Sequence, residues 1–179
     1  MKNTSISGFF ATVLLLVLTA SAASADSGKP KKLKAKLSGF LEVPVSISTA
    51  GNGEFRATVN ESETMITYEL KYEDLEGGTV LAAHVHIGQR ATAGGVMFFL
   101  CGGGGKPACP SSGTVTGTVV AADIIGPEAQ GVSPGQLAEA IRAMRAGAAY
   151  ANVHTTTYPT GEIRGQIRNR GGGDDDNDQ

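Results

Sequence analysis

The sequence of 179 residues lacks tryptophan, and it contains only two cysteines, three histidines and 6% aromatic residues. It also lacks an excess of one charge, since its formal net charge is −2 at pH 7. A nucleic-acid-binding protein usually carries a strongly basic face, so this balance argues against nucleic acid as a partner. No nucleophile elbow, no His-Glu-x-x-His motif and no phosphate-binding loop before a helix is present. We therefore predict no catalytic residue.

Long apolar runs are missing except at the N-terminus, where residues 1–25 predict a secretory signal peptide. Lys2 provides a positive charge, residues 6–20 are almost wholly apolar, and Ala23 and Ala25 are small residues at the positions that a signal peptidase recognises. The run is short for a membrane span of about 20 residues, which disfavours a permanent anchor. We expect cleavage after Ala25, no transmembrane segment in the remaining chain, and a secreted or periplasmic protein.

The chain that remains after cleavage has 14 basic and 17 acidic residues, because the leader carries Lys2 and no acid. Residues 26–32 are rich in lysine and are expected to form a basic, flexible N-terminal segment. Residues 170–179 are rich in glycine and aspartate and are expected to form a disordered tail. Residues 33–169 are long enough for one domain with its own core.

The two cysteines, Cys101 and Cys109, flank a glycine-rich stretch. In an exported protein such a pair favours a disulfide bond. The bond would close a short loop, so its effect on stability is expected to be local. The spacing differs from the Cys-x-x-Cys of redox proteins, which disfavours a redox role.

Most of the remaining chain alternates between apolar and polar residues with a period of two, as strands with one buried face do. The alternating runs cover residues 34–41, 54–59, 66–72, 114–119 and 162–168. Each run is short and is bounded by Gly, Pro, Asn or Asp. This pattern predicts an all-β fold, an antiparallel sandwich or barrel.

One segment has helical rather than strand periodicity. Ser133 is suited to cap a helix, Pro134 suits its first position, and Gly147 can end it. Between them, apolar residues at helical spacing are Leu137, Ile141 and Met144. We predict one short helix here, with its apolar stripe packed on the core.

All three histidines lie in two short segments that resemble strands. Side chains alternate along a strand, so His84 and His86 share one face, and His154 shares a face with Asn152 in its own segment. In the last strand Glu162 and Arg164 share a polar face. If these three strands are neighbours, their polar faces bring together His84, His86, His154, Asn152, Glu162 and Arg164.

Two interpretations of this cluster stay open. Three neutral imidazoles can bind zinc or copper, with Asn152 or Glu162 orienting the ligands. Alternatively, the groups form a structural polar network in which Arg164 pairs with Glu162, because buried polar groups need partners.

The chain also contains an ordered set of motifs, namely Leu37–Pro44, Gly51–Phe55, Tyr68–Leu70, Ala83–Gly88, Tyr150–Thr155 and Gly161–Ile167. This set resembles the CHRD domain, known as a repeat in the secreted protein chordin and also found singly in bacterial proteins. The resemblance covers roughly residues 33–168. It implies an extracellular all-β domain, an antiparallel Greek-key or immunoglobulin-like β-sandwich with one short helix, and no established catalytic activity.

A second resemblance is narrower. The His-Val-His string in an exported β fold is similar to a copper-ligand pair of Cu/Zn superoxide dismutase, although three histidines are too few for the two metals of that enzyme. We predict first a non-enzymatic extracytoplasmic binding or structural module, with an extracellular protein or envelope component as partner. The second hypothesis is a copper- or zinc-binding protein that uses His84, His86 and His154, and the third is superoxide-dismutase-like redox activity.

Overall fold

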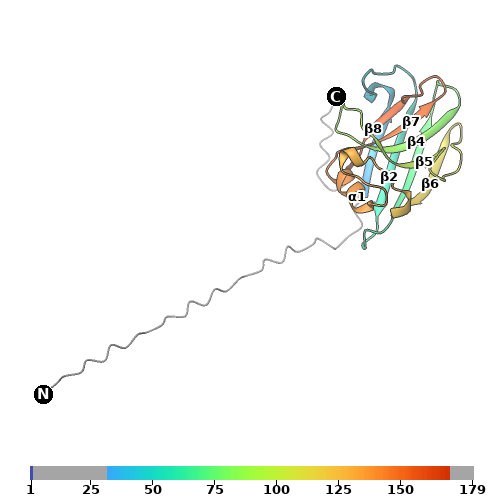
Figure 1. Ribbon diagram of the computed structural model, residues 1–179. Coiled ribbons are helices and arrows are strands. Elements are labelled where there is room, and N and C mark those ends of the chain that lie inside the picture. The colour runs from blue at the N-terminus through green and yellow to red at the C-terminus, as the bar shows by residue number, and fades with distance from the viewer. Residues whose placement is uncertain (2–31, 170–179) are drawn as a thin grey trace.

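The computed structural model describes Met1 and residues 32–169 (Figure 1). The predicted signal peptide beyond Met1, residues 26–31 and the predicted tail lie outside the described residues. Lys32, which we expected in a flexible segment, is the first residue of a strand and pairs with Thr58. Within the described part of the chain, no helix is long and apolar enough to cross a membrane.

The described residues form a nine-stranded sheet, three short 3-10 helices and one α-helix. The strands are β1 (Lys32–Ser38), β2 (Asn52–Val59), β3 (Ile66–Glu73), β4 (Val80–Ile87), β5 (Val96–Cys101), β6 (Gly113–Val119), β7 (Ala149–Thr155), β8 (Ile163–Gln166) and β9 (Arg168–Asn169). The helices are η1 (Gly39–Leu41), η2 (Ala121–Asp123), η3 (Glu128–Gln130) and α1 (Leu137–Arg145).

The strands pair in the order β5-β4-β7-β8-β1-β2-β3-β6, with β9 beside β1, and every pair is antiparallel. The sheet curls until its two edges, β5 and β6, come into contact, which gives a nearly closed barrel (Figure 1). Two tyrosines of β3 bond to the edge strand β5 and to the connection that follows it. The hydroxyl of Tyr68 donates to the carbonyl of Leu100, and that of Tyr72 donates to the carbonyl of Pro110.

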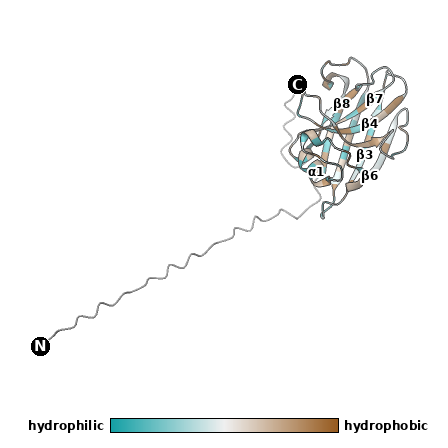
Figure 2. Cartoon of the chain, in the orientation of Figure 1, coloured by the Kyte–Doolittle hydropathy of each residue, from teal (hydrophilic) through white to brown (hydrophobic). Residues whose placement is uncertain are grey.

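The interior of the barrel holds one apolar core, as the alternating pattern predicts. Along β1, Leu33, Ala35 and Leu37 are buried, while the lysines between them point outward. Figure 2 shows this alternation as brown and teal residues that follow one another along the strands. Burial of the apolar face of each strand is the main favourable contribution to this fold.

The predicted disulfide is confirmed. Cys101 ends β5, Cys109 lies in the connection to β6, and their sulfur atoms are bonded. The bond ties down the glycine-rich loop at the point where the two sheet edges meet. A disulfide of this kind fits an exported protein, because the cytoplasm keeps thiols reduced.

The predicted helix is present but begins later than expected. Pro134 lies in a turn, and α1 starts at Leu137, because Gly135 has a φ of +82° that a right-handed helix cannot contain. The C-terminal end follows the prediction. Gly147, with a φ of +69°, donates to the carbonyl of Met144, and Ala148 donates to that of Ala143, which together form a Schellman motif.

The prediction of an antiparallel all-β fold with one α-helix is thus confirmed. Its finer form, a Greek-key or immunoglobulin-like sandwich of two sheets, is not confirmed. The strands instead belong to one continuous sheet that curls into a barrel. This architecture places β4, β7 and β8 side by side, so the three polar faces singled out in the sequence lie on neighbouring strands.

Candidate metal centre

The three histidines come together on the outer face of β4 and β7. In the register of this antiparallel pair, His154 lies opposite Ala82 and Asn152 lies opposite His84. The alternate residues, such as Ala83 and Val153, point into the barrel core. Although the histidines face away from the core, His86 and His154 are buried and His84 is partly buried.

Loops cover this outer face, and their carbonyl groups bind two of the imidazoles. Nδ1 of His86 lies 3.0 Å from the carbonyl oxygen of Gly94, in the β4–β5 connection. Nδ1 of His154 lies 3.1 Å from that of Pro159, in the β7–β8 connection. The ring of Phe99 packs edge-on against His84, with centroids 4.5 Å apart.

These contacts assign the tautomers, because a carbonyl oxygen only accepts hydrogen bonds. Nδ1 of His86 and of His154 must each carry the proton, which leaves a lone pair on each Nε2. Nδ1 of His84 lies 3.3 Å from Nε2 of His86, so His84 donates this hydrogen bond. Nε2 of His154 is buried and has no hydrogen-bond partner.

The arrangement is close to that of a three-histidine metal site. One ligand atom from each imidazole lies within 4.8 Å of the other two. Bonds of about 2.0–2.1 Å to a tetrahedral zinc ion would place nitrogen ligands about 3.3–3.4 Å apart. The distance between Nδ1 of His84 and Nε2 of His86 already has this value. Bringing the ligand atoms from 4.8 Å to that separation would take a movement of at most about 1.5 Å.

The protonation states suit metal binding. Burial lowers the pKa of His84 to about 3 and that of His86 to about 4, and it also lowers the pKa of His154. The neighbouring imidazoles add to the effect at His84, because two positive charges at this distance repel each other. All three side chains are therefore neutral at pH 7, the form that binds a metal ion.

Arg164 supports the centre without joining it. Its guanidinium carbon lies 3.5 Å from the centroid of the Tyr150 ring, and Tyr150 stacks on His86 with centroids 4.7 Å apart. The guanidinium also donates to the carbonyl of Gln89. These contacts hold the His86 ring in place from the side of β8, with a cation–π interaction over the tyrosine.

Asn152 lies beside the histidines but binds an acid that the sequence analysis did not single out. Its amide donates to the carboxylate of Glu42 at 2.5 Å and to the carbonyl of Ile163 at 2.9 Å. Glu42 follows η1, and burial raises its pKa to about 7 despite the amide and the positive charge of Arg164. No periodic pattern marks Glu42, and its place within the Leu37–Pro44 motif was the only available signal.

Glu162 requires a correction. One interpretation of the sequence pairs Glu162 with Arg164. In the structure the Glu162 carboxylate instead accepts hydrogen bonds from the backbone amides of Glu76 and Gly77 and from the hydroxyl of Thr155. The acid whose charge acts on Arg164 is Glu42 instead. Glu162 therefore anchors the β3–β4 connection, and the polar network around the histidines contains Glu42 in its place.

The buried titratable groups predict how stability depends on pH. The histidines are neutral in the folded protein but protonated in the unfolded chain below about pH 6.5, so metal-free protein loses stability as the pH falls from 6.5 to about 4. Glu42 opposes this trend. Its pKa is about 7 in the folded protein against an ordinary 4.5. Its contribution to the stability of the folded protein therefore falls as the pH rises from 4.5 to about 7.

We therefore expect Glu42→Gln to steepen the rise of stability with pH by about 1.4 kcal/mol per pH unit between pH 4.5 and 7, the value for one proton. Urea denaturation of metal-free protein over a pH series measures this slope. Glu61→Gln, at an exposed position, serves as the control and should leave the slope unchanged. An identical slope for Glu42→Gln and the unaltered protein would contradict the prediction.

Comparison with known proteins agrees with the motifs. The family model described as the CHRD domain matches residues 33–167, which is most of the chain and nearly all of its described part. The chain belongs to the CHRD domain family. Its members are extracellular modules, and the family suggests a binding or structural role. No significant match to a curated protein or to a solved structure was found. The histidines of this CHRD domain lie in β4 and β7, within the matched range.

Proposed function

We propose that this CHRD domain is an exported, non-enzymatic binding module whose ligand is one copper or zinc ion, held by His84, His86 and His154. One observation carries the proposal, namely that the three ligand atoms lie within 4.8 Å of one another. Export is supported by the disulfide between Cys101 and Cys109 and by the apolar leader in the sequence.

Groups that could form a second coordination shell contact two of the imidazoles. Metal-binding histidines usually donate their other ring nitrogen to a carbonyl or carboxylate, which orients the ring. The carbonyls of Gly94 and Pro159 provide this support for His86 and His154. The buried Nε2 of His154 gains the partner that it otherwise lacks.

In metal-free protein a proton lies between His84 and His86 where the ion would bind. To serve as a ligand through Nδ1, His84 would carry its proton on Nε2 instead, which would require no net release of a proton from this ring. Three imidazoles leave one position of a tetrahedral ion open for water or a small ligand. Imidazole suits both ions, and copper(II) binds such a site more tightly than zinc.

A structural polar network is the second candidate, and the hydrogen bond between His84 and His86 supports it. The two candidates differ in one respect. A network is complete without an ion, whereas Nε2 of His154 has no partner until one binds. A measurement of metal binding therefore distinguishes the metal site from the structural polar network.

The test uses the chain from Asp26 to Gln179, without a histidine tag and stripped of metal by a chelator. We expect one copper or zinc ion per chain, measured by elemental analysis after removal of free metal. The double variant His84→Ala/His86→Ala should bind none. Thr116→Ala, on the outer side of β6, is a control that should bind as the unaltered chain does. Metal that is absent from the unaltered chain, or that persists in the double variant, would refute the proposal.

A further inference from the structure

A second candidate binding surface lies away from the histidines, on the outer side of β1. A groove of about 670 Å³ is lined there by six basic side chains and one acidic side chain. The basic residues are Lys32, Lys34 and Lys36 of β1, Arg56 of β2, Arg90 of the β4–β5 connection and Arg168 of β9. The whole chain has a net charge of −2, so the lining of this groove is more basic than the chain as a whole. We call these six residues the basic groove.

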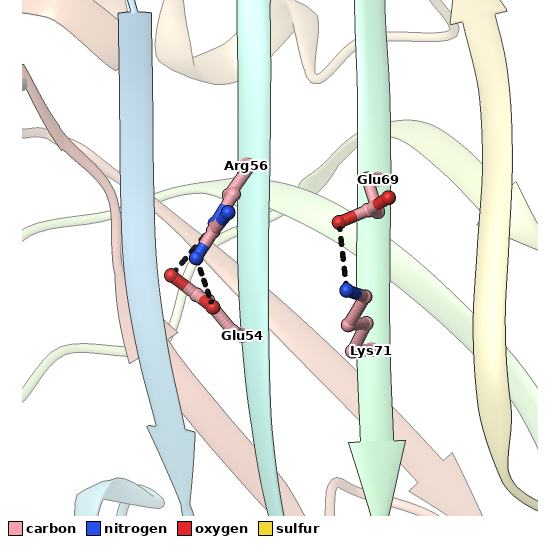
Figure 3. Close-up of polar contacts among 4 residues, drawn as sticks. All are labelled: Glu54, Arg56, Glu69 and Lys71. Carbon is pink, nitrogen blue, oxygen red and sulfur yellow. Dashed lines mark hydrogen bonds and ion pairs between the residues drawn. The ribbon is translucent and has the colours of Figure 1, made fainter.

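Two ion pairs lie on the strands beside and within this groove. Glu54, the acid among the lining residues, accepts two hydrogen bonds from Arg56, both at 2.8 Å (Figure 3). On β3, the next strand, Glu69 and Lys71 form an ion pair at 3.3 Å, so each of these two charges has its opposite (Figure 3). Basic side chains therefore outnumber acidic ones six to one along the groove, whereas the pair on β3 has one of each.

Exposed apolar side chains adjoin the basic groove. Phe40 and Val45 are each 65% exposed and Leu41 is 39% exposed. All three lie in one stretch of six residues, 40–45, in the β1–β2 connection. Leu41 also lines the groove itself, so the two features are continuous. Single exposed apolar residues are common, but a group of three on one loop favours an interaction site. We call Phe40, Leu41 and Val45 the apolar tip.

The fold holds the apolar tip outward. The carbonyl of Gly39 accepts hydrogen bonds from the amides of Glu42 and Ile47, which closes the base of the loop. The side chain of Glu42 points inward to Asn152, and Ser46 donates to the carbonyl of Phe40. These hydrogen bonds hold the backbone of the loop, and the apolar side chains remain exposed.

We propose that the basic groove and the apolar tip together dock this domain on a membrane surface rich in anionic lipid. The basic residues would lie over the headgroups, and Phe40, Leu41 and Val45 would enter the boundary of the acyl chains. Peripheral membrane binding combines these two contributions, electrostatic attraction and buried apolar area. A hydrated soluble polyanion accounts for the basic groove alone, because it offers the apolar tip nothing apolar to contact. The inference is independent of the metal site.

The test measures sedimentation of the Asp26–Gln179 chain, which lacks the apolar leader, with vesicles of phosphatidylcholine alone or mixed with phosphatidylglycerol. We expect binding to the mixed vesicles only, weakened by high salt. Lys32→Gln/Lys36→Gln should reduce the affinity about 30-fold, at about a tenfold loss per 1.4 kcal/mol and roughly 1 kcal/mol per basic residue. Phe40→Ser/Val45→Ser should reduce it about tenfold or more.

Matched controls place the same changes elsewhere. Lys71→Gln/Arg142→Gln removes two charges outside the basic groove, and Leu81→Ser removes an exposed apolar side chain outside the apolar tip. Both controls should bind as the unaltered chain does. All four variants alter exposed or groove-lining side chains, and circular dichroism checks that each folds.

Three outcomes would overturn the proposal. The first is no binding of the unaltered chain to the mixed vesicles. The second is full binding by Phe40→Ser/Val45→Ser together with displacement by dextran sulfate, which would identify a site for soluble polyanions. The third is binding only by a chain that ends at Asn169, which would make the acidic residues 174–178 the occupant of the groove.

Discussion

Replacing His154 with alanine should lower the affinity of the protein for copper or zinc by more than about 100-fold. Loss of a partner that only orients a ligand typically costs 10–100-fold in metal affinity, so loss of a ligand should cost more. Two imidazoles would remain, on a single strand, with no carboxylate or thiolate in the described cluster to replace the third. Competition with a chromogenic chelator measures the affinity of each variant.

The matched variant is His86→Ala, which removes a different ligand of the same three. We expect a similar loss of affinity but a larger loss of stability in metal-free protein, by about 1–2 kcal/mol relative to His154→Ala. His86 makes two hydrogen bonds and stacks on Tyr150, whereas His154 has one hydrogen bond and an unpaired Nε2. Equal stability of the two metal-free variants would argue against the assigned hydrogen bonds, and unchanged metal affinity of either would exclude it as a ligand.

Glu162→Ala should destabilise the protein by about 3–5 kcal/mol, a large part of the 5–15 kcal/mol typical of a whole domain. The carboxylate is completely buried and accepts three hydrogen bonds, at 2.7 Å from the Glu76 amide, 3.0 Å from the Gly77 amide and 2.8 Å from the Thr155 hydroxyl. Truncation leaves the Gly77 amide and the Thr155 hydroxyl buried without this acceptor, and it removes a link between the β3–β4 connection and β7. Urea denaturation measures the loss.

The stability of Glu162→Gln should lie between that of Glu162→Ala and that of the unaltered protein. Its amide oxygen can still accept from one backbone donor, while the second donor loses its partner. Glu61→Ala, at an exposed position, should change the stability by less than about 0.5 kcal/mol. If Glu162→Ala were as stable as Glu61→Ala, the anchoring role of this carboxylate would be wrong.

Alternation along the chain predicted the strands that have one buried face. The runs at 54–59, 66–72 and 114–119 correspond to β2, β3 and β6. Alternation did not predict β5, because Val96–Cys101 is almost continuously apolar and has no period of two. The run at 162–168 is divided between β8 and β9. Local periodicity reports which face of a strand is buried, but it does not report where pairing stops.

The start of the helix shows the limit of local motifs. Ser133 and Pro134 are typical of a helix start, and the amide of Ser133 does interact with the side chain of Gln136. The left-handed backbone of Gly135 nevertheless delays α1 to Leu137. Glycine adopts either backbone region, so the sequence alone could not decide this.

The sequence by itself determined the family, the disulfide pair and the face on which each histidine lies. These features depend on ordered motifs and on the period of two within single strands, which are local properties. Only the tertiary structure decided that β4 and β7 are neighbours, that loop carbonyls of Gly94 and Pro159 cover the imidazoles, and that Glu42 rather than Glu162 acts on Arg164. Those contacts join residues far apart in the chain, and their partners are chosen by how the sheet curls and which loops fold over it.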